Sequence, residues 1–156
     1  FATQCPDCQT RVINVPIADW ASGLQGEVQT ALVADPTITH VYPIYDGMTA
    51  GASPAIIASD SDVKIVTVDA SEFVLRLMQD DDIVIMDQGY NLRQLGWSDA
   101  DQTFRVLLGG PVPENNYVTS RIFDDSNVDE AGVPANQLEG YGDAYITGFR
   151  TLWGLE

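Results

Sequence analysis

Apolar residues in this chain fall into two kinds of segment that alternate along its length. Short apolar runs predict strands at residues 11–16, 40–45, 63–69, 83–88 and 116–123. Longer segments with apolar residues at helical spacing predict helices at residues 21–34, 47–59, 71–79, 92–108 and 141–153. Alternating strands and helices of this length are typical of βαβ units. The sequence therefore predicts an α/β fold, a three-layer α/β/α sandwich with a mainly parallel sheet.

Three of the predicted helices carry an apolar stripe, which predicts the side that packs inward. In the helix at 21–34 the stripe consists of Leu24, Val28, Ala31 and Leu32. In the helix at 92–108, which Gly109 is expected to end, it consists of Leu92, Leu95, Phe104 and Leu108. In the helix at 141–153 it consists of Tyr141, Tyr145, Phe149, Leu152 and Trp153. Residues 124–140 are rich in acids and turn formers and are expected to form a flexible acidic connection.

The net charge of the chain limits the classes of partner that it is expected to bind. Its 156 residues include 23 acidic and 7 basic side chains, a formal net charge of −16. Nucleic acids and anionic membrane surfaces are bound through Lys and Arg, so neither is an expected partner. The longest strongly apolar run, from Ile83 to Met86, is far too short for a membrane span.

The two cysteines, Cys5 and Cys8, enclose a Pro-Asp pair that favours a turn and would bring the sulfur atoms close. A zinc site would need about four ligands, and His40 is the sole histidine, so the pair is poorly suited to zinc. A thioredoxin-like redox pair would follow a strand, whereas this pair precedes one. A structural disulfide in an extracytoplasmic protein is the favoured interpretation, and free thiols are the alternative.

Candidate ligand-binding residues follow the predicted strands, because ligands of open α/β sheets lie outside the carboxyl ends of the strands. The residues at these ends are Trp20, Tyr45, Asp46, Asp69, Gln88 and Tyr90. Carboxylates accept hydrogen bonds from several hydroxyls, and aromatic rings pack on the C–H face of a sugar. The set therefore favours a neutral polyhydroxylated ligand. Four of these residues also have a structural interpretation, with Asp46 or Asp69 as a cap of the helix that follows, Trp20 as a core anchor and Tyr90 as an exposed loop aromatic. Ser71 is the expected N-cap of the helix at 71–79.

The sequence offers little for catalysis. It contains no G-x-S-x-G nucleophile elbow, no G-x-x-x-x-G-K-[ST] phosphate loop and no G-x-G-x-x-G fingerprint. The acids of 124–129 lack the ligand spacing of a calcium loop. We expect no catalytic residue, cofactor or metal.

Four segments together resemble the carboxyl-terminal half of a type I periplasmic binding protein of the ribose-like, sugar-binding group. They read ADW, ALVADPTITHVYPIYDGMTAGA, VKIVTVDAS and LRQLGWSDADQTFRVLLGGPVP. The tail from NVDEAG to YGDAYITGFRTLWGL is also similar to members of this group. The resemblance spans nearly the whole chain, and the order and spacing of the segments carry it more than any one of them.

The resemblance assigns roles to the residues at the strand ends. Trp20 matches a cleft aromatic, and Asp69 matches the acceptor of sugar hydroxyls. Tyr45-Asp46 stands where the family has Asn-Asp, so that an aromatic ring replaces an amide. Gln88 or Tyr90 lies at the position of a cleft glutamine. The small residues of Met48–Ala52 match a segment that lets its helix lie close against the sheet.

The resemblance also implies an architecture and a function. The chain would be one lobe of a two-lobe receptor that binds a sugar or polyol and delivers it to the permease of an ABC importer outside the cytoplasm. The helix at 92–109 would pack on the missing amino-terminal lobe through an apolar face of Leu92, Leu95, Trp97, Phe104 and Leu108. In isolation it would pack on a second copy of the chain, as a homodimer, or fold back on its own lobe. The alternative is the effector-binding lobe of a LacI-type transcriptional regulator, which shares this architecture.

Overall fold

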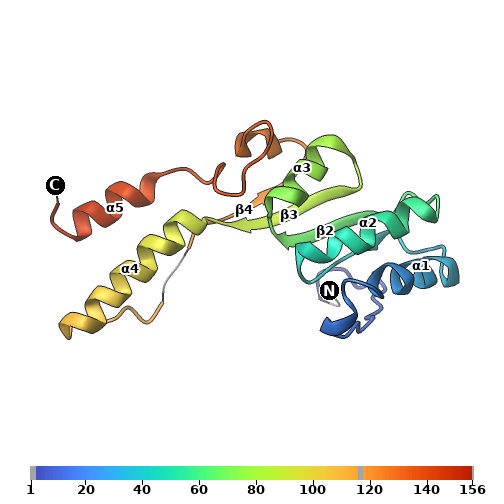
Figure 1. Ribbon diagram of the computed structural model, residues 1–156, viewed down its shortest axis with the longest axis horizontal. Helices are drawn as coiled ribbons and strands as arrows, with labels where there is room; N and C mark the ends of the chain where they lie inside the picture. The colour runs from blue at the N-terminus through green and yellow to red at the C-terminus, as the bar shows by residue number, and fades with distance from the viewer. Residues whose placement is uncertain (1–2, 116–117, 156) are drawn as a thin grey trace.

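The computed structural model describes residues 3–115 and 118–155, which include a four-stranded sheet. The strands lie in the order β1 (His40–Val41), β2 (Lys64–Asp69), β3 (Val84–Tyr90) and β4 (Ser120–Phe123). The first three are parallel, and β4 runs antiparallel to β3 (Figure 1). The predicted α/β class and mainly parallel sheet are confirmed.

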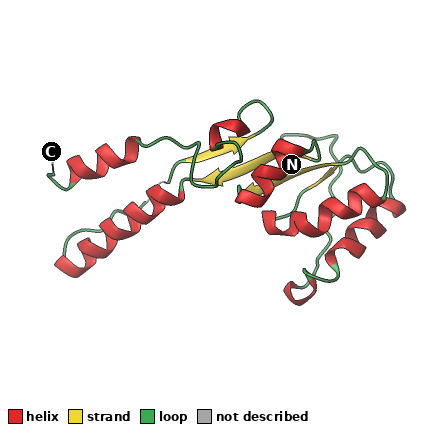
Figure 2. Cartoon of the chain, turned by 45° about the horizontal axis from the view of Figure 1, so that its top comes forward, coloured by secondary structure: helices red, strands yellow, loops and turns green. Residues whose placement is uncertain are grey.

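The helices form two groups. Within the described residues the α-helices are α1 (Leu24–Ala34), α2 (Thr49–Ala58), α3 (Glu72–Asp80), α4 (Leu92–Leu108) and α5 (Ala144–Leu152). Short 3-10 helices lie at Ile17–Asp19, Asp46–Met48 and Val128–Ala131. Helices α1 to α3 gather around the sheet, whereas α4 and α5 extend beyond it side by side (Figures 1 and 2). None of the helices in these described ranges is both long and apolar enough to cross a membrane.

The contact between α1 and α2 explains the small residues of α2. The predicted stripe of α1 is confirmed, since Leu24, Val28, Ala31 and Leu32 are all buried. A Cβ added at Gly51 would lie 3.1 Å from Leu24 Cδ2, so the glycine allows α1 to approach α2. The resemblance predicts this close approach against the sheet. At Gly51 the structure instead places it between two helices, while Ala52 and Ala55 of α2 are buried in the core.

One face of the sheet is buried more deeply than the other. Four side chains on the deeply buried face are each at most 1% exposed, namely Ile65, Thr67, Asp87 and Phe123. The opposite face carries side chains that are half-buried or exposed, namely Val66, Val68, Gln88 and Ile122. Side chains of this second face lie near the surface at the carboxyl end of β3.

Three predicted strands differ from the structure. Residues 11–16 form no strand, since no neighbouring strand pairs with them and Val12 is 83% exposed. The strand predicted at 40–45 stops at Val41, because Pro43 has no N–H to donate to a sheet. The strand predicted at 116–123 is present only as β4, and residues 116–117 lie outside the described residues.

The helix predicted at 141–153 begins three residues late, at Ala144. Gly140 and Gly142 have φ angles of 86° and 75°, which are incompatible with a right-handed helix. Tyr141 therefore lies in a loop, where its ring meets Phe123 edge-on with the centroids 5.4 Å apart. The loop thus brings Tyr141 onto the buried face of the sheet.

The helix predicted at 92–108 is present with the same bounds, but this chain alone does not bury the residues predicted to face inward. Asn91 Oδ1 accepts a hydrogen bond from the Gln94 N–H at 3.0 Å, and Gly109 ends the helix with a φ of 69°. The residues predicted to face inward are instead between 37% and 85% exposed, namely Leu92, Leu95, Phe104 and Leu108. The partner that this chain supplies for α4 is α5, which covers part of it, and Trp153 at the end of α5 lines one concave surface with Phe104 and Leu108.

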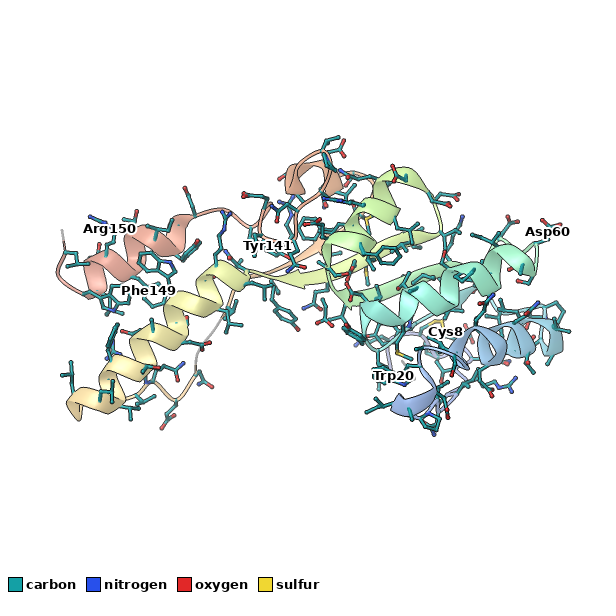
Figure 3. The ribbon with its side chains drawn as sticks, in the orientation of Figure 1. Cys8, Trp20, Asp60, Tyr141, Phe149 and Arg150 are labelled. Carbon is teal, nitrogen blue, oxygen red and sulfur yellow. A yellow bond between two sulfur atoms is a disulfide. The ribbon has the colours of Figure 1, made fainter. Side chains whose placement is uncertain are left out.

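Helices α4 and α5, which we call the arm, are joined by aromatic contacts. Trp97 stacks on Trp153 with 5.3 Å between ring centroids, and it also contacts Tyr145 and Phe149. The Trp153 Nε1–H donates to Asp101 Oδ1 at 2.8 Å. Figure 3 labels Phe149 and Arg150 on α5 and shows the α5 side chains next to those of α4. The predicted aromatic stripe of α5 is therefore confirmed for its three last aromatic residues.

Trp97→Ala in the 156-residue chain is expected to release α5 from α4. No residue of α5 is fully buried, and Trp97 makes three of the ring contacts that hold it. Each such pair contributes about 0.5–1.5 kcal/mol beyond its burial. Tryptic cleavage after Arg150 should therefore accelerate by about tenfold or more, since cleavage follows local opening. Leu107→Ala, at a 74% exposed position of α4, is the matched control and should leave the rate unchanged.

Residues 124–140 pack more closely than a flexible connection would. Val128, Ala131 and Ala135 are buried in the core. Gln79 of α3 fixes the segment from both sides, because its Nε2 donates to the Gly132 carbonyl and its Oε1 accepts from the Ala135 N–H, each at 2.9 Å. The acids of this segment lie on a loop whose apolar side chains cover α3.

Cys5 and Cys8 form a disulfide, with 5.3 Å between their Cα atoms. The structure thus pairs the two cysteines as a closed turn before the first helix.

Candidate ligand-binding site

The carboxyl ends of β1, β2 and β3 lie along one edge of the sheet, because the three strands are parallel neighbours. The antiparallel β4 begins at this edge, with Ser120 opposite Tyr90. This strand-end edge carries the candidate residues Tyr45, Asp46, Asp69, Gln88 and Tyr90. Trp20 reaches the same group from the segment that precedes α1.

Two aromatic rings from distant parts of the chain stack at this edge. The rings of Trp20 and Tyr45 lie 6.1 Å apart with 28° between their planes. Trp20 Nε1–H donates to the Val15 carbonyl at 2.8 Å, which fixes the indole. The Tyr45 ring lies over Gly47, where an added Cβ would be 2.3 Å from Tyr45 Cε1. Tyr45 remains 46% exposed, so the pair presents a ring surface to solvent.

Asp69 is the exposed carboxylate of the edge. It ends β2 with a φ of 115°, and Ala70 follows with a φ of 51°, so two successive residues occupy the left-handed region. Partial burial raises the pKa of Asp69, and the nearby Asp46 carboxylate raises it further. The side chain is available to a ligand in a place where its charge is already disfavoured.

Asp46 is buried, whereas a side chain that contacts a ligand must be accessible. It is only 1% exposed, and its Oδ2 accepts a hydrogen bond from the Ser71 N–H at 2.6 Å. The predicted N-cap residue Ser71 stands at the cap position but makes no side-chain cap bond. Asp46 therefore caps α3 from the neighbouring strand end, rather than the helix that directly follows it.

Asp87 belongs to this cluster but was absent from the sequence-based set. It is fully buried, its Oδ1 accepts from the Ala70 N–H at 3.1 Å, and its Oδ2 has no partner within the described residues. Burial raises the pKa of Asp87 to about 7, and Asp46 and Asp69 add to the rise. The sequence signal was a lone acid at the end of the apolar run that forms β3.

The remaining candidates, Gln88 and Tyr90, lie on either side of Gly89, which is the β3 partner of Asp69. Alternation along β3 places both on the face opposite Asp87. Gln88 is half-buried and Tyr90 is 40% exposed. The structure therefore brings Asp69, Gln88 and Tyr90 to neighbouring positions at the strand ends, with Asp46 and Asp87 behind them.

A concave surface of about 510 Å³ lies along β4, next to the strand-end edge. It is lined by Thr119, Ser120, Arg121, Glu130, Gly140, Tyr141 and Gly142. The guanidinium group of Arg121 in this surface already has protein partners. It forms an ion pair with Glu130 at 2.8 Å and donates a hydrogen bond to the Gly140 carbonyl. None of the sequence-predicted residues lines it, so we place the candidate site at the strand-end edge. Across the described residues, no group of three or more His, Cys, Asp or Glu is arranged to hold a metal ion.

Comparison with known proteins identifies the class of fold. No protein-family profile and no curated protein sequence matches the chain. A solved sugar ABC transport substrate-binding protein from Bordetella parapertussis matches with a TM-score of 0.70 and 17% identity, over 91% of this chain and 48% of its own. An ABC transporter solute-binding protein from Agrobacterium vitis with bound allitol matches with a TM-score of 0.66 and 25% identity, over 80% and 44%. A Mycobacterium smegmatis protein in complex with β-D-fucofuranose matches with a TM-score of 0.63 and 29% identity, over 72% and 38%.

These matches define the fold of a substrate-binding protein of the ABC transporter class. The chain has the type I periplasmic-binding-protein fold of the ribose-like, sugar-binding receptors, over a length that corresponds to a single lobe. It spans less than half the length of each of the three solved proteins.

Proposed function

We propose that this chain is one lobe of the extracytoplasmic solute-binding component of an ABC importer, and that it binds a sugar or related polyol at the strand-end edge. The observation that carries the proposal is the stacked Trp20–Tyr45 pair at the same edge as the exposed Asp69 carboxylate, on a fold shared with sugar receptors. A ring surface and a hydrogen-bond acceptor are the two groups that a polyhydroxylated ligand needs.

The ligand contacts in this proposal come from Trp20, Tyr45, Asp69, Gln88 and Tyr90. The function is binding without catalysis, and the second lobe closes over the ligand and presents it to the permease. The matched proteins that hold allitol and β-D-fucofuranose support a polyol or sugar as the ligand class. The Cys5–Cys8 disulfide supports an oxidising compartment. The matched proteins from Bordetella parapertussis and Agrobacterium vitis are ABC transporter binding proteins, which favours a transport receptor over a LacI-type regulator.

The arm belongs, in this proposal, with the second lobe. Its apolar residues are left exposed in the chain alone, with Phe104 at 58%, Leu107 at 74% and Leu108 at 85%. Fully burying a large apolar side chain is worth about 1.5–3 kcal/mol, so a partner surface would be strongly stabilising. A second lobe is the natural partner because the chain spans less than half of each solved relative, and a second copy is the alternative for the isolated chain.

The test is a thermal-shift screen of the two-lobe protein against pentoses, hexoses, polyols and amino acids. A ligand at 100 times its Kd should stabilise by about 2.7 kcal/mol, which appears as a raised Tm. Asp69→Ala should remove the shift, whereas Asp62→Ala, an exposed acid before the opposite end of β2, should keep it. If no sugar or polyol in the panel raises the Tm, the proposal is contradicted.

A further inference from the structure

The turn at residues 69–71, which connects β2 to α3, has an unfavourable backbone. Asp69 and Ala70 both have positive φ angles, 115° and 51°, although neither is a glycine. Such conformations persist only where the surrounding structure holds them. The turn also carries the one exposed carboxylate of the candidate site, so whatever holds it decides where that carboxylate points.

Two buried carboxylates hold successive N–H groups of this turn. Asp87 Oδ1 accepts from Ala70 at 3.1 Å, and Asp46 Oδ2 accepts from Ser71 at 2.6 Å. Asp46 follows β1 and Asp87 lies in β3, so the acceptors come from the strands on both sides of β2. Both acceptors are at most 1% exposed, and a hydrogen bond in the low-dielectric interior is electrostatically stronger than one in water.

The local sequence does not supply these bonds. The Ser71 side chain makes no cap bond. The methyl group of Ala70 lies so close to Gly89 of β3 that a Cβ there would be 2.4 Å from it. The side-chain acceptors that hold the Ala70 and Ser71 N–H groups therefore come from β3 and from the segment that follows β1.

We propose that Asp46 and Asp87 are positioning residues, which hold the 69–71 turn in its left-handed conformation and so direct the Asp69 carboxylate outward toward the ligand. Neither residue needs to touch the ligand for this role. This positioning role rests on the proposed function in one respect, namely that Asp69 binds a sugar or polyol.

Amide hydrogen exchange of the two-lobe protein, followed residue by residue by NMR, tests the turn itself. The Ala70 amide should be protected in the wild-type protein and in Asp87→Asn, which keeps an acceptor, and should exchange about tenfold or more faster in Asp87→Ala. The Ser71 amide should respond in the same way to Asp46→Asn and Asp46→Ala. Protection of Ala70 that is equal in Asp87→Ala and wild type overturns the proposal. If the alanine variants do not fold, an unprotected Ala70 or Ser71 amide in the wild-type protein overturns it, and protection of both supports it.

Titration calorimetry with allitol and with D-fucose separates this proposal from the proposed function. Asp87→Ala should weaken binding about tenfold or more, because a misplaced carboxylate loses its alignment, and Asp87→Asn should stay close to wild type. Asp69→Ala should lose binding while both amides stay protected. Unchanged affinity in Asp87→Ala overturns the positioning role. If neither compound binds but the amides respond as expected, the turn mechanism is supported and the assumed ligand class is wrong.

Discussion

Gly89→Ala is expected to destabilise the chain by about 2–3 kcal/mol or more, at the upper end of the cost of overpacking. A Cβ at this position would lie 1.9 Å from Tyr141 Oη and 2.4 Å from Ala70 Cβ. Neither neighbour has an easy way to retreat. Ala70 is fully buried in a turn held by two hydrogen bonds, and the Tyr141 ring is packed against Phe123.

Urea unfolding of the 156-residue chain measures this effect. Gly96→Ala in α4 is the matched control, since nothing lies within 4 Å of its added Cβ. There the same change should stabilise by up to about 1 kcal/mol, because Ala is the better helix former. Tyr141→Phe combined with Gly89→Ala should recover part of the loss by removing the closer of the two contacts. A Gly89→Ala chain as stable as wild type would show that the strand-end cluster is looser than the structure describes.

The second large effect is a fall in stability as the pH rises from about 5 to 8. The folded chain raises the pKa of Asp87 from 3.8 to about 7, chiefly by burial. A carboxyl group with a raised pKa stabilises the folded state while protonated, and this contribution is lost as the pH rises through the folded-state value. Each pKa unit corresponds to about 1.36 kcal/mol, so the loss should be on the order of 2–4 kcal/mol.

The groups around Asp87 leave this sign unchanged. Asp46 and Asp69 repel its charge, and the pKa of Tyr141, raised to about 12 mainly by burial, places that hydroxyl outside the window. The acids with lowered pKa values, such as Asp101 and Glu130, act only at lower pH. Urea titrations at several pH values should show the fall for wild type and a nearly flat profile for Asp87→Asn. Equal slopes in the two proteins would exclude Asp87 as the source.

The spacing of apolar residues along the sequence predicted some features of the fold and could not predict others. The four buried residues of α1 follow from helical spacing alone, because a lone amphipathic face has one way to pack. The strand at 11–16 was wrong because an apolar run does not reveal whether a partner strand exists. The apolar stripe of α4 stays exposed in this chain for a related reason, since helical spacing does not reveal how much of a helix its partner covers.

The strand-end edge was predictable, but its internal bonding was not. A parallel sheet places the ends of β1, β2 and β3 together, so Asp69 and its neighbours could be listed from the sequence. The stacking of Trp20 on Tyr45 joins residues from separate segments, and no local pattern encodes it. Asp87 was missed because a single acid after an apolar run is indistinguishable from an exposed strand end until burial is known.

The bonds that hold the 69–71 turn have a consequence for folding. They join Ala70 to a residue 17 positions away and Ser71 to one 25 positions away, and none is local. The turn can therefore take its final shape only after β1, β2 and β3 have assembled, and the loop-closure cost of both contacts is paid before it forms. A ligand that binds the aligned Asp69 selects the assembled sheet, so its binding energy stabilises three strands at once rather than one loop.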